Sequence, residues 1–304
     1  MKNFLWLVVL ILLSGVKGVA AQQAPVEKDF KAIAWKHLSN IVEFGPRPPG
    51  SPAHANLRQY IKTIGLQHAD SVAELPFNYQ TEEGQIIPMF NLEFKIEGTE
   101  GGRPILLGAH FDTRRFADED SDPENQKKPI VGANDGGSGT ALLLALAEYF
   151  KEHRPRRPVH LVFFDGEDYG VKFSNNYFLG SKHYAEGVSR RSEDEKPFCV
   201  LVLDMVADRD LKIYKEVYSN EGAPWLVDLL FDTAHRLKYR QFTPRPRYTI
   251  RDDHLPFLKV GIPAAVLIDF DYPHWHTQED TLDKCSDESL YIVFNVVTEA
   301  VAMM

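Results

Sequence analysis

The sequence predicts an α/β fold: an open, mixed, mostly parallel and twisted sheet with helices on both faces. Several short runs are apolar almost throughout, as expected for strands that helices cover on both sides. Segments with helical spacing alternate with these runs, and this alternation favours an α/β fold over other classes. Polar residues of catalytic types follow several runs directly, where such sheets place their ligands. Strands are expected at residues 72–79, 89–96, 105–109, 159–164, 199–203 and 264–268.

Helices are expected where apolar residues recur every three or four positions. The first covers residues 32–42, and the Gly- and Pro-rich segment 45–50 ends it. Ser51 or Ala53 opens the second helix. Further helices are expected at residues 141–152, 179–187, 224–237, 253–259 and 287–301, and exposed polar loops at 114–129 and 189–196.

The N-terminus has the pattern of a secretion signal. Lys2 precedes an apolar run over residues 4–13, which is too short to span a bilayer comfortably, and small residues follow it. We expect residues 1–21 to be a signal peptide and residues 22–304 to form one domain with a hydrophobic core, in a periplasmic or secreted protein. An uncleaved membrane anchor is the alternative, whereas cleavage would leave no stable membrane insertion.

The charge balance excludes nucleic acid as an expected partner. The formal net charge of the chain is −9, and no basic stripe is present to neutralise phosphates. The two cysteines, Cys199 and Cys285, lie far apart and lack the spacing of a zinc knuckle. They could pair in an oxidising compartment, but two unpaired thiols, with Cys199 buried in a strand, is the favoured interpretation.

Acidic and histidine side chains are expected to converge at one rim of the sheet. His110 follows one expected strand, Glu167 and Asp168 follow another, and Asp204 closes a third. Asp135 precedes the Gly-rich start of a helix. The carboxyl ends of parallel strands meet at one edge, so these residues are expected to lie together. The remaining candidates are Asp112, Asp252, Trp275 and His276.

Each of these residues also has an ordinary structural interpretation. His110 and Asp112 could form a simple hydrogen bond, and Asp135 or Asp252 could cap a helix. Asp204 is harder to explain in this way, because it closes an apolar run and needs a partner when buried. Taken together, repelling carboxylates at one place require a cation or shared protons. Mixed Asp, Glu and His ligation suits Zn²⁺ with one position left open.

Three segments resemble the core motifs of the metallopeptidase family that includes the bacterial zinc aminopeptidases and the glutaminyl cyclases. They are residues 108–113, 132–139 and 164–168, which are specific as a set although each alone is weak. Two more segments resemble the cyclase branch: an Asp-Asp-His-Leu-Pro-Phe sequence at 252–257 and a Trp-His-Thr sequence at 275–277. The resemblance extends over most of the mature chain.

The resemblance implies a zinc-dependent cyclisation of N-terminal glutamine in peptides and proteins to pyroglutamate, with release of ammonia. It also implies roles for individual residues. One zinc would be held by Asp135, Asp168 and His276. Glu167 would act as the acid and base, Asp204 and Asp252 would form a hydrogen-bonded pair beside the substrate, and Trp275 and Phe173 would line the substrate pocket.

Some positions depart from the animal cyclases, and a rival function uses the same residues. Asp168 stands where animal cyclases have Glu, and Phe173 stands where they carry Trp, which suggests a bacterial type. The rival is a two-zinc aminopeptidase, with His110 and Asp204 completing the second metal site. A non-enzymatic ectodomain is a third possibility, because fold does not fix function. If cleavage leaves Gln22 first, the protein is also a candidate substrate of its own activity.

Overall fold

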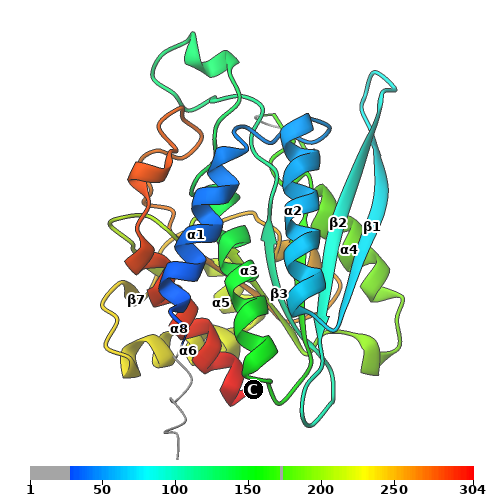
Figure 1. Cartoon of the computed structure of the whole chain (residues 1–304), viewed down its shortest axis with the longest axis vertical. Coiled ribbons are helices and arrows are strands. Elements are labelled where there is room, and N and C mark those ends of the chain that lie inside the picture. The colour runs from blue at the N-terminus through cyan, green and yellow to red at the C-terminus, as the bar shows by residue number, and fades with distance from the viewer. Residues whose placement is uncertain (1–27, 172–173) are drawn as a thin grey trace, which may run out of the picture.

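The computed structural model describes residues 28–171 and 174–304, so the expected signal peptide, Gln22 and Phe173 lie outside the described residues. Its centre is a six-stranded sheet, shown in Figure 1. The strands are β1 (Ser71–Gln80), β2 (Ile86–Ile96), β3 (Ile105–His110), β4 (Val159–Phe164), β5 (Cys199–Asp204) and β8 (Ala264–Ile268).

The sheet is mixed and mostly parallel, as the sequence predicts. Its strand order is β1-β2-β4-β3-β5-β8. The four strands β4, β3, β5 and β8 run parallel, while β2 is antiparallel to both of its neighbours. The carboxyl ends of the four parallel strands therefore share one edge. All six expected strands are present, with ends that differ from the expected ones by at most three residues.

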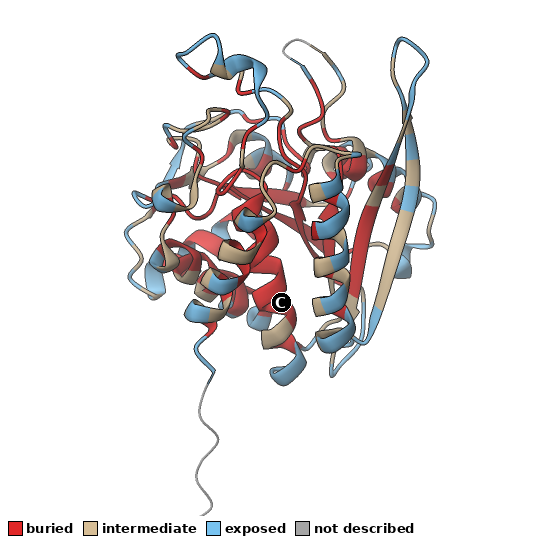
Figure 2. Cartoon of the chain, turned by 45° about the horizontal axis from the view of Figure 1, so that its top comes forward, coloured by how far each residue is buried: buried red, intermediate tan, exposed pale blue. Residues whose placement is uncertain are grey.

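Helices cover both faces of the sheet, which confirms the predicted layers. The larger apolar core joins one face to α1, α2, α3, α6 and α8. The smaller core joins the other face to α4 and α7. Figure 2 shows the buried residues in the sheet and on the inner sides of these helices. The helices are α1 (Phe30–Glu43), α2 (Pro52–His68), α3 (Gly137–Glu152), α4 (Leu179–Ser189), α5 (Val217–Gly222), α6 (Pro224–Arg236), α7 (Leu255–Lys259) and α8 (Asp287–Met303).

The elements that the sequence did not predict are short. They are β6 (Ile213–Lys215) and β7 (Phe242–Pro246), which form a second, two-stranded sheet, together with α5. A three-residue strand or a six-residue helix is too short to show a period in the sequence. The 3₁₀ turns η1 (Asn125–Lys127), η2 (Glu193–Glu195) and η3 (Leu282–Lys284) complete the described elements.

Both cysteine thiols are buried and unpaired, which confirms the favoured interpretation. Within residues 28–171 and 174–304, we find no helix that combines the length and the apolar character required to cross a membrane.

The start of α3 is packed tightly against the strands that carry the candidate site. α3 begins four residues before the expected helix, and its Gly139 faces the end of β5. A Cβ atom at Gly139 would lie 2.1 Å from the backbone oxygen of Leu203 and 2.9 Å from the Cβ of Ala109. Glycine is therefore required for this approach, which sets the position of the loop that carries Asp135.

Replacing Gly139 with alanine is expected to destabilise the fold, because backbone and not a flexible side chain blocks the new methyl group. The free energy of unfolding should fall by about 1–3 kcal/mol, as for other overpacked sites. Urea denaturation followed by circular dichroism measures this change. Gly187→Ala is the matched control: Gly187 lies in α4, and a Cβ atom added there would meet nothing within 4 Å. That variant should gain about 0.5–1 kcal/mol, and a Gly139→Ala protein as stable as the control would contradict the packing argument.

Candidate metal centre and active site

Most of the residues singled out in the sequence line one cavity of about 220 Å³. The cavity opens beyond the carboxyl ends of the parallel strands. Of the candidates, it contains Asp135, Glu167, Asp168, Asp204, Asp252, Trp275 and His276. His110 does not line the cavity, but its ring contacts two carboxylates that do.

Asp135, Asp168 and His276 form a buried group with the chemistry of a metal site. The Nε2 atom of His276 lies 3.4 Å from Asp135 Oδ2 and 3.4 Å from Asp168 Oδ1. All three side chains are buried, and the Oδ2 atoms of both aspartates have no hydrogen-bond partner among the described residues. A buried carboxylate oxygen without a partner is costly. A zinc ion among these two oxygens and one imidazole nitrogen would satisfy them, so the donor set fits the metal.

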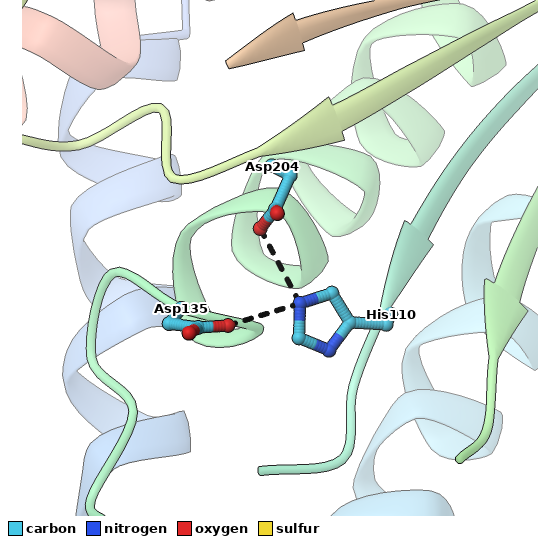
Figure 3. A group of neighbouring side chains, drawn as sticks. All are labelled: His110, Asp135 and Asp204. Carbon is cyan, nitrogen blue, oxygen red and sulfur yellow. Dashed lines mark hydrogen bonds and ion pairs between the residues drawn. The ribbon is translucent and has the colours of Figure 1, made fainter. Parts of the chain in front are cut away.

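A second group shares Asp135 with the first. Figure 3 shows the ring of His110 directed at Asp135 and Asp204. Its Nε2 atom lies 3.2 Å from Asp135 Oδ1 and 3.3 Å from Asp204 Oδ1. The two oxygens of Asp135 therefore face two different histidines. The ligand atoms of this group also lie close enough together to hold a metal ion.

Two carboxylates outside the groups hold the ligand-bearing loops. Asp112 accepts hydrogen bonds from the backbone N–H of Glu167, at 3.1 Å, and of Asp168, at 3.2 Å. Asp280 accepts from the backbone N–H of Asn134, at 2.8 Å, and of Asp135, at 3.1 Å. Charge-assisted bonds of this kind are stronger than neutral ones. They fix the loops after β4 and before α3, and so fix the ligand carboxylates.

Glu167 and Asp252 both have raised pKa values, which favour the protonated form. Glu167 is half-buried, and its pKa lies well above its usual range, mainly because of burial. The charge of His110 opposes this rise, and those of Asp168 and the neighbouring acids add to it. Burial also raises the pKa of Asp252 well above its usual range, and the charge of Asp204 raises it further. The pairing of Asp204 and Asp252 through a shared proton stays a prediction. It is favoured by the effect of the Asp204 charge on the pKa of Asp252, since repulsion between two carboxylates falls when one of them holds a proton.

Trp275 supplies the flat apolar wall that the sequence suggests. Its ring stacks on His276 with centroids 3.9 Å apart and an interplanar angle of 26°. It also packs against Phe270, with ring centroids 5.2 Å apart. Both rings line the cavity.

Backbone strain is concentrated on the cavity wall. Four non-glycine residues in the described parts of the chain have a positive φ. Three of them line the cavity: Met205, with φ of 45°, His276, with 54°, and Phe178, with 58°. Such conformations persist only where the surroundings enforce them, and they gather at functional sites.

The expectation that residues 114–129 form an exposed loop is wrong in part. Arg114 and Asp120 are buried, and Arg114 donates to Asp168 at 2.7 Å. It also binds both oxygens of Asp118, which approaches His276. The polar composition predicts side chains that face solvent, whereas these charged side chains are buried against one another. A signal was present, since Arg114 directly follows a motif at a strand end.

Two polar residues beside the motifs have structural partners instead. Asp165 accepts from the His54 ring at 2.8 Å and from the backbone N–H of Phe90 at 2.8 Å. Asp253 accepts from the Ser181 hydroxyl at 2.5 Å. These contacts explain why neither side chain lines the cavity.

Comparisons with known proteins agree with this geometry. The model of peptidase family M28 matches residues 91–301. Glutaminyl-peptide cyclotransferase from Boiga irregularis is 28% identical over 82% of this chain and 76% of its own length. The crystal structure of Tannerella forsythia glutaminyl cyclase superposes with a TM-score of 0.84, at 30% identity over 90% of this chain and 98% of that one.

A relative described as a peptidase is equally similar in structure. A leucine aminopeptidase precursor from Bacteroides thetaiotaomicron superposes with a TM-score of 0.85, at 28% identity over 90% of this chain and 97% of that one. The family match covers more than half of the chain and includes every residue of the two His–Asp groups. The chain therefore belongs to peptidase family M28, as a glutaminyl cyclase-like member.

Proposed function

We propose that this protein is a zinc-dependent glutaminyl-peptide cyclotransferase. It would convert the N-terminal glutamine of peptides and proteins to pyroglutamate and release ammonia. One observation carries the proposal: the cavity brings Asp252 and Trp275 beside the group of Asp135, Asp168 and His276. Those two positions are the ones in which the sequence resembles the cyclases rather than the aminopeptidases.

The reaction requires the α-amine to attack the side-chain amide of its own residue. Asp135, Asp168 and His276 would hold the zinc ion, which, when bound, polarises the amide carbonyl as a Lewis acid. Glu167 would take a proton from the amine and return it to the departing ammonia. Burial raises its pKa well above the usual range, which makes the carboxyl a stronger base for taking up the amine proton than an exposed one.

Asp204 and Asp252 would share a proton and stabilise positive charge on the reacting nitrogen. The cavity favours a cationic amino terminus, since acidic side chains outnumber basic ones on its wall. The acids are Asp118, Glu119, Asp135, Glu167, Asp168, Asp204 and Asp252, and the bases are Arg114 and Arg251. Trp275 would hold the glutamine side chain in the folded conformer that places amine and amide in contact.

A secretion signal would place this activity in the periplasm or outside the cell. Removal of residues 1–21 would expose Gln22, which would itself be a substrate. Peptides and proteins with N-terminal glutamine are therefore the proposed partners.

A second candidate function is that of a two-zinc aminopeptidase. The group of His110, Asp135 and Asp204 favours it, because these ligand atoms can hold a second metal ion. Glu167 would then activate water instead of moving a proton between two nitrogens of the substrate.

Product mass distinguishes the two functions. Purified protein, loaded with zinc or stripped with a chelator, would be incubated with matched peptides that begin with Gln or Leu. We expect loss of one ammonia from the Gln peptide alone, with this activity abolished by the chelator and restored by zinc. Release of free leucine would refute the cyclase proposal and favour a second zinc at His110.

Glu167→Gln should lower kcat by at least about 100-fold, because the amide can neither accept nor return the proton. Rates come from the same mass assay, and zinc content is measured in parallel to show that the metal site is intact. Glu82→Gln is the control for loss of one negative charge, since Glu82 is exposed in the turn between β1 and β2. Activity of Glu167→Gln close to that of this control would refute the assigned role.

Trp275→Ala should lower kcat/KM by about 10–100-fold, since the folded substrate loses its apolar wall. Trp275→Phe should retain most activity, because a flat ring remains. The matched control is Trp225→Ala, since Trp225 lies on α6, outside the cavity, and is 40% exposed. If both alanine variants behaved alike, Trp275 would have no part in substrate binding.

A further inference from the structure

One carboxylate orients the candidate histidine ligand. Asp118 Oδ1 lies 3.3 Å from Nδ1 of His276, while Nε2 on the opposite side of the ring faces Asp135 and Asp168. A carboxylate at Nδ1 holds the ring proton there and directs the lone pair of Nε2 toward the metal. The position of Asp118 at Nδ1 therefore suits the tautomer of His276 whose Nε2 is free to bind a metal ion.

One guanidinium connects this carboxylate to a second ligand. Arg114 donates from Nε to Asp118 Oδ1 at 2.6 Å and from Nη2 to Asp118 Oδ2 at 2.6 Å. The third nitrogen, Nη1, donates to Asp168 Oδ1 at 2.7 Å. Bonds to Tyr177 and Gly170 complete its contacts. The fork of Arg114 thus fixes the distance between Asp168 and the carboxylate that orients His276.

The backbone fixes the same segments relative to one another. The N–H of Glu119 donates to the backbone oxygen of His276 at 3.2 Å. The N–H of Gln278 donates to Asp120 Oδ2 at 3.0 Å. The loop that carries Asp118 is therefore bonded to the backbone of His276 and of Gln278, and the left-handed backbone of His276 requires such support.

We propose that Arg114 and Asp118 are positioning residues that preorganise the zinc ligands before the metal arrives. The proposal rests on the proposed function, because it concerns the zinc of that site. A lysine in place of Arg114 would keep the charge but could not bind both Asp118 oxygens and Asp168 in one plane. The negative charge of Asp118 also offsets the positive charge that Arg114 brings next to a cation site.

The test measures zinc affinity directly, by competition with a chromogenic chelator, on full-length metal-stripped protein. Asp118→Asn and Arg114→Lys should each raise the zinc Kd by about 10–100-fold, the range for partners of metal ligands. The double variant should lose less than the product of the two single effects, because both residues act through one network. Arg115→Lys is the matched control, because Arg115 stacks on the Tyr169 ring and donates to the backbone oxygen of Tyr169. The zinc Kd of this variant should lie within twofold of the wild-type value.

Melting of the zinc-free proteins separates positioning from general stabilisation. Zinc-free Asp118→Asn should melt somewhat below wild type, because the buried Arg114 loses a charged partner, but it should stay folded at the temperature of the zinc assay. This variant decides the matter if Arg114→Lys does not fold. A wild-type zinc Kd in Asp118→Asn would overturn the inference. It would also be overturned if the zinc-free variant were so unstable that its unfolded fraction accounted for the weaker binding. Absence of zinc binding by the wild-type protein would instead overturn the proposed function, and the inference with it.

Discussion

The burial of several carboxylates in one small cavity is the constraint on which the rest of the site depends. Asp135, Asp168, Asp204 and Asp252 are all buried at the same end of the sheet. Negative charges removed from water repel one another strongly, so they need a cation, a shared proton or hydrogen-bond donors. The site combines these solutions: histidines and Arg114 face some of the oxygens, and a raised pKa marks Asp252 as a proton holder.

Neighbouring aspartates hold the loops and the ring that carry the candidate ligands. Asp112 and Asp280 bind backbone N–H groups of the ligand loops, and Asp118 binds the far side of His276. Each of these aspartates therefore has hydrogen-bond donors or cationic partners of its own. With the loops held in this way, the Oδ2 atoms of Asp135 and Asp168 are left without a hydrogen bond from any described residue.

The sheet and the convergence of the candidate ligands could be predicted from the sequence, because they depend on local patterns. Apolar runs located the six strands, and the acidic residues directly after them located the cavity. The contribution of Arg114 and Asp118 could not be predicted in this way. A polar loop gives no sign of whether its charges face water or one another, and the loop becomes buried only through contacts with the segment around His276. The β6–β7 pair was missed because β6 has only three residues, whereas β7 is mostly exposed and contains two prolines, which are unusual in strands.

The central claim is that one zinc ion lies among Asp135, Asp168 and His276. Anomalous diffraction at the zinc edge, from crystals grown with excess zinc, tests it most directly. The account predicts a single anomalous peak, with a zinc-to-Nε2 distance to His276 of about 2.0–2.1 Å, and His110 still in contact with Asp204. A second peak among His110, Asp135 and Asp204 would contradict the account and favour a two-zinc peptidase, and the absence of a peak among Asp135, Asp168 and His276 would remove its basis.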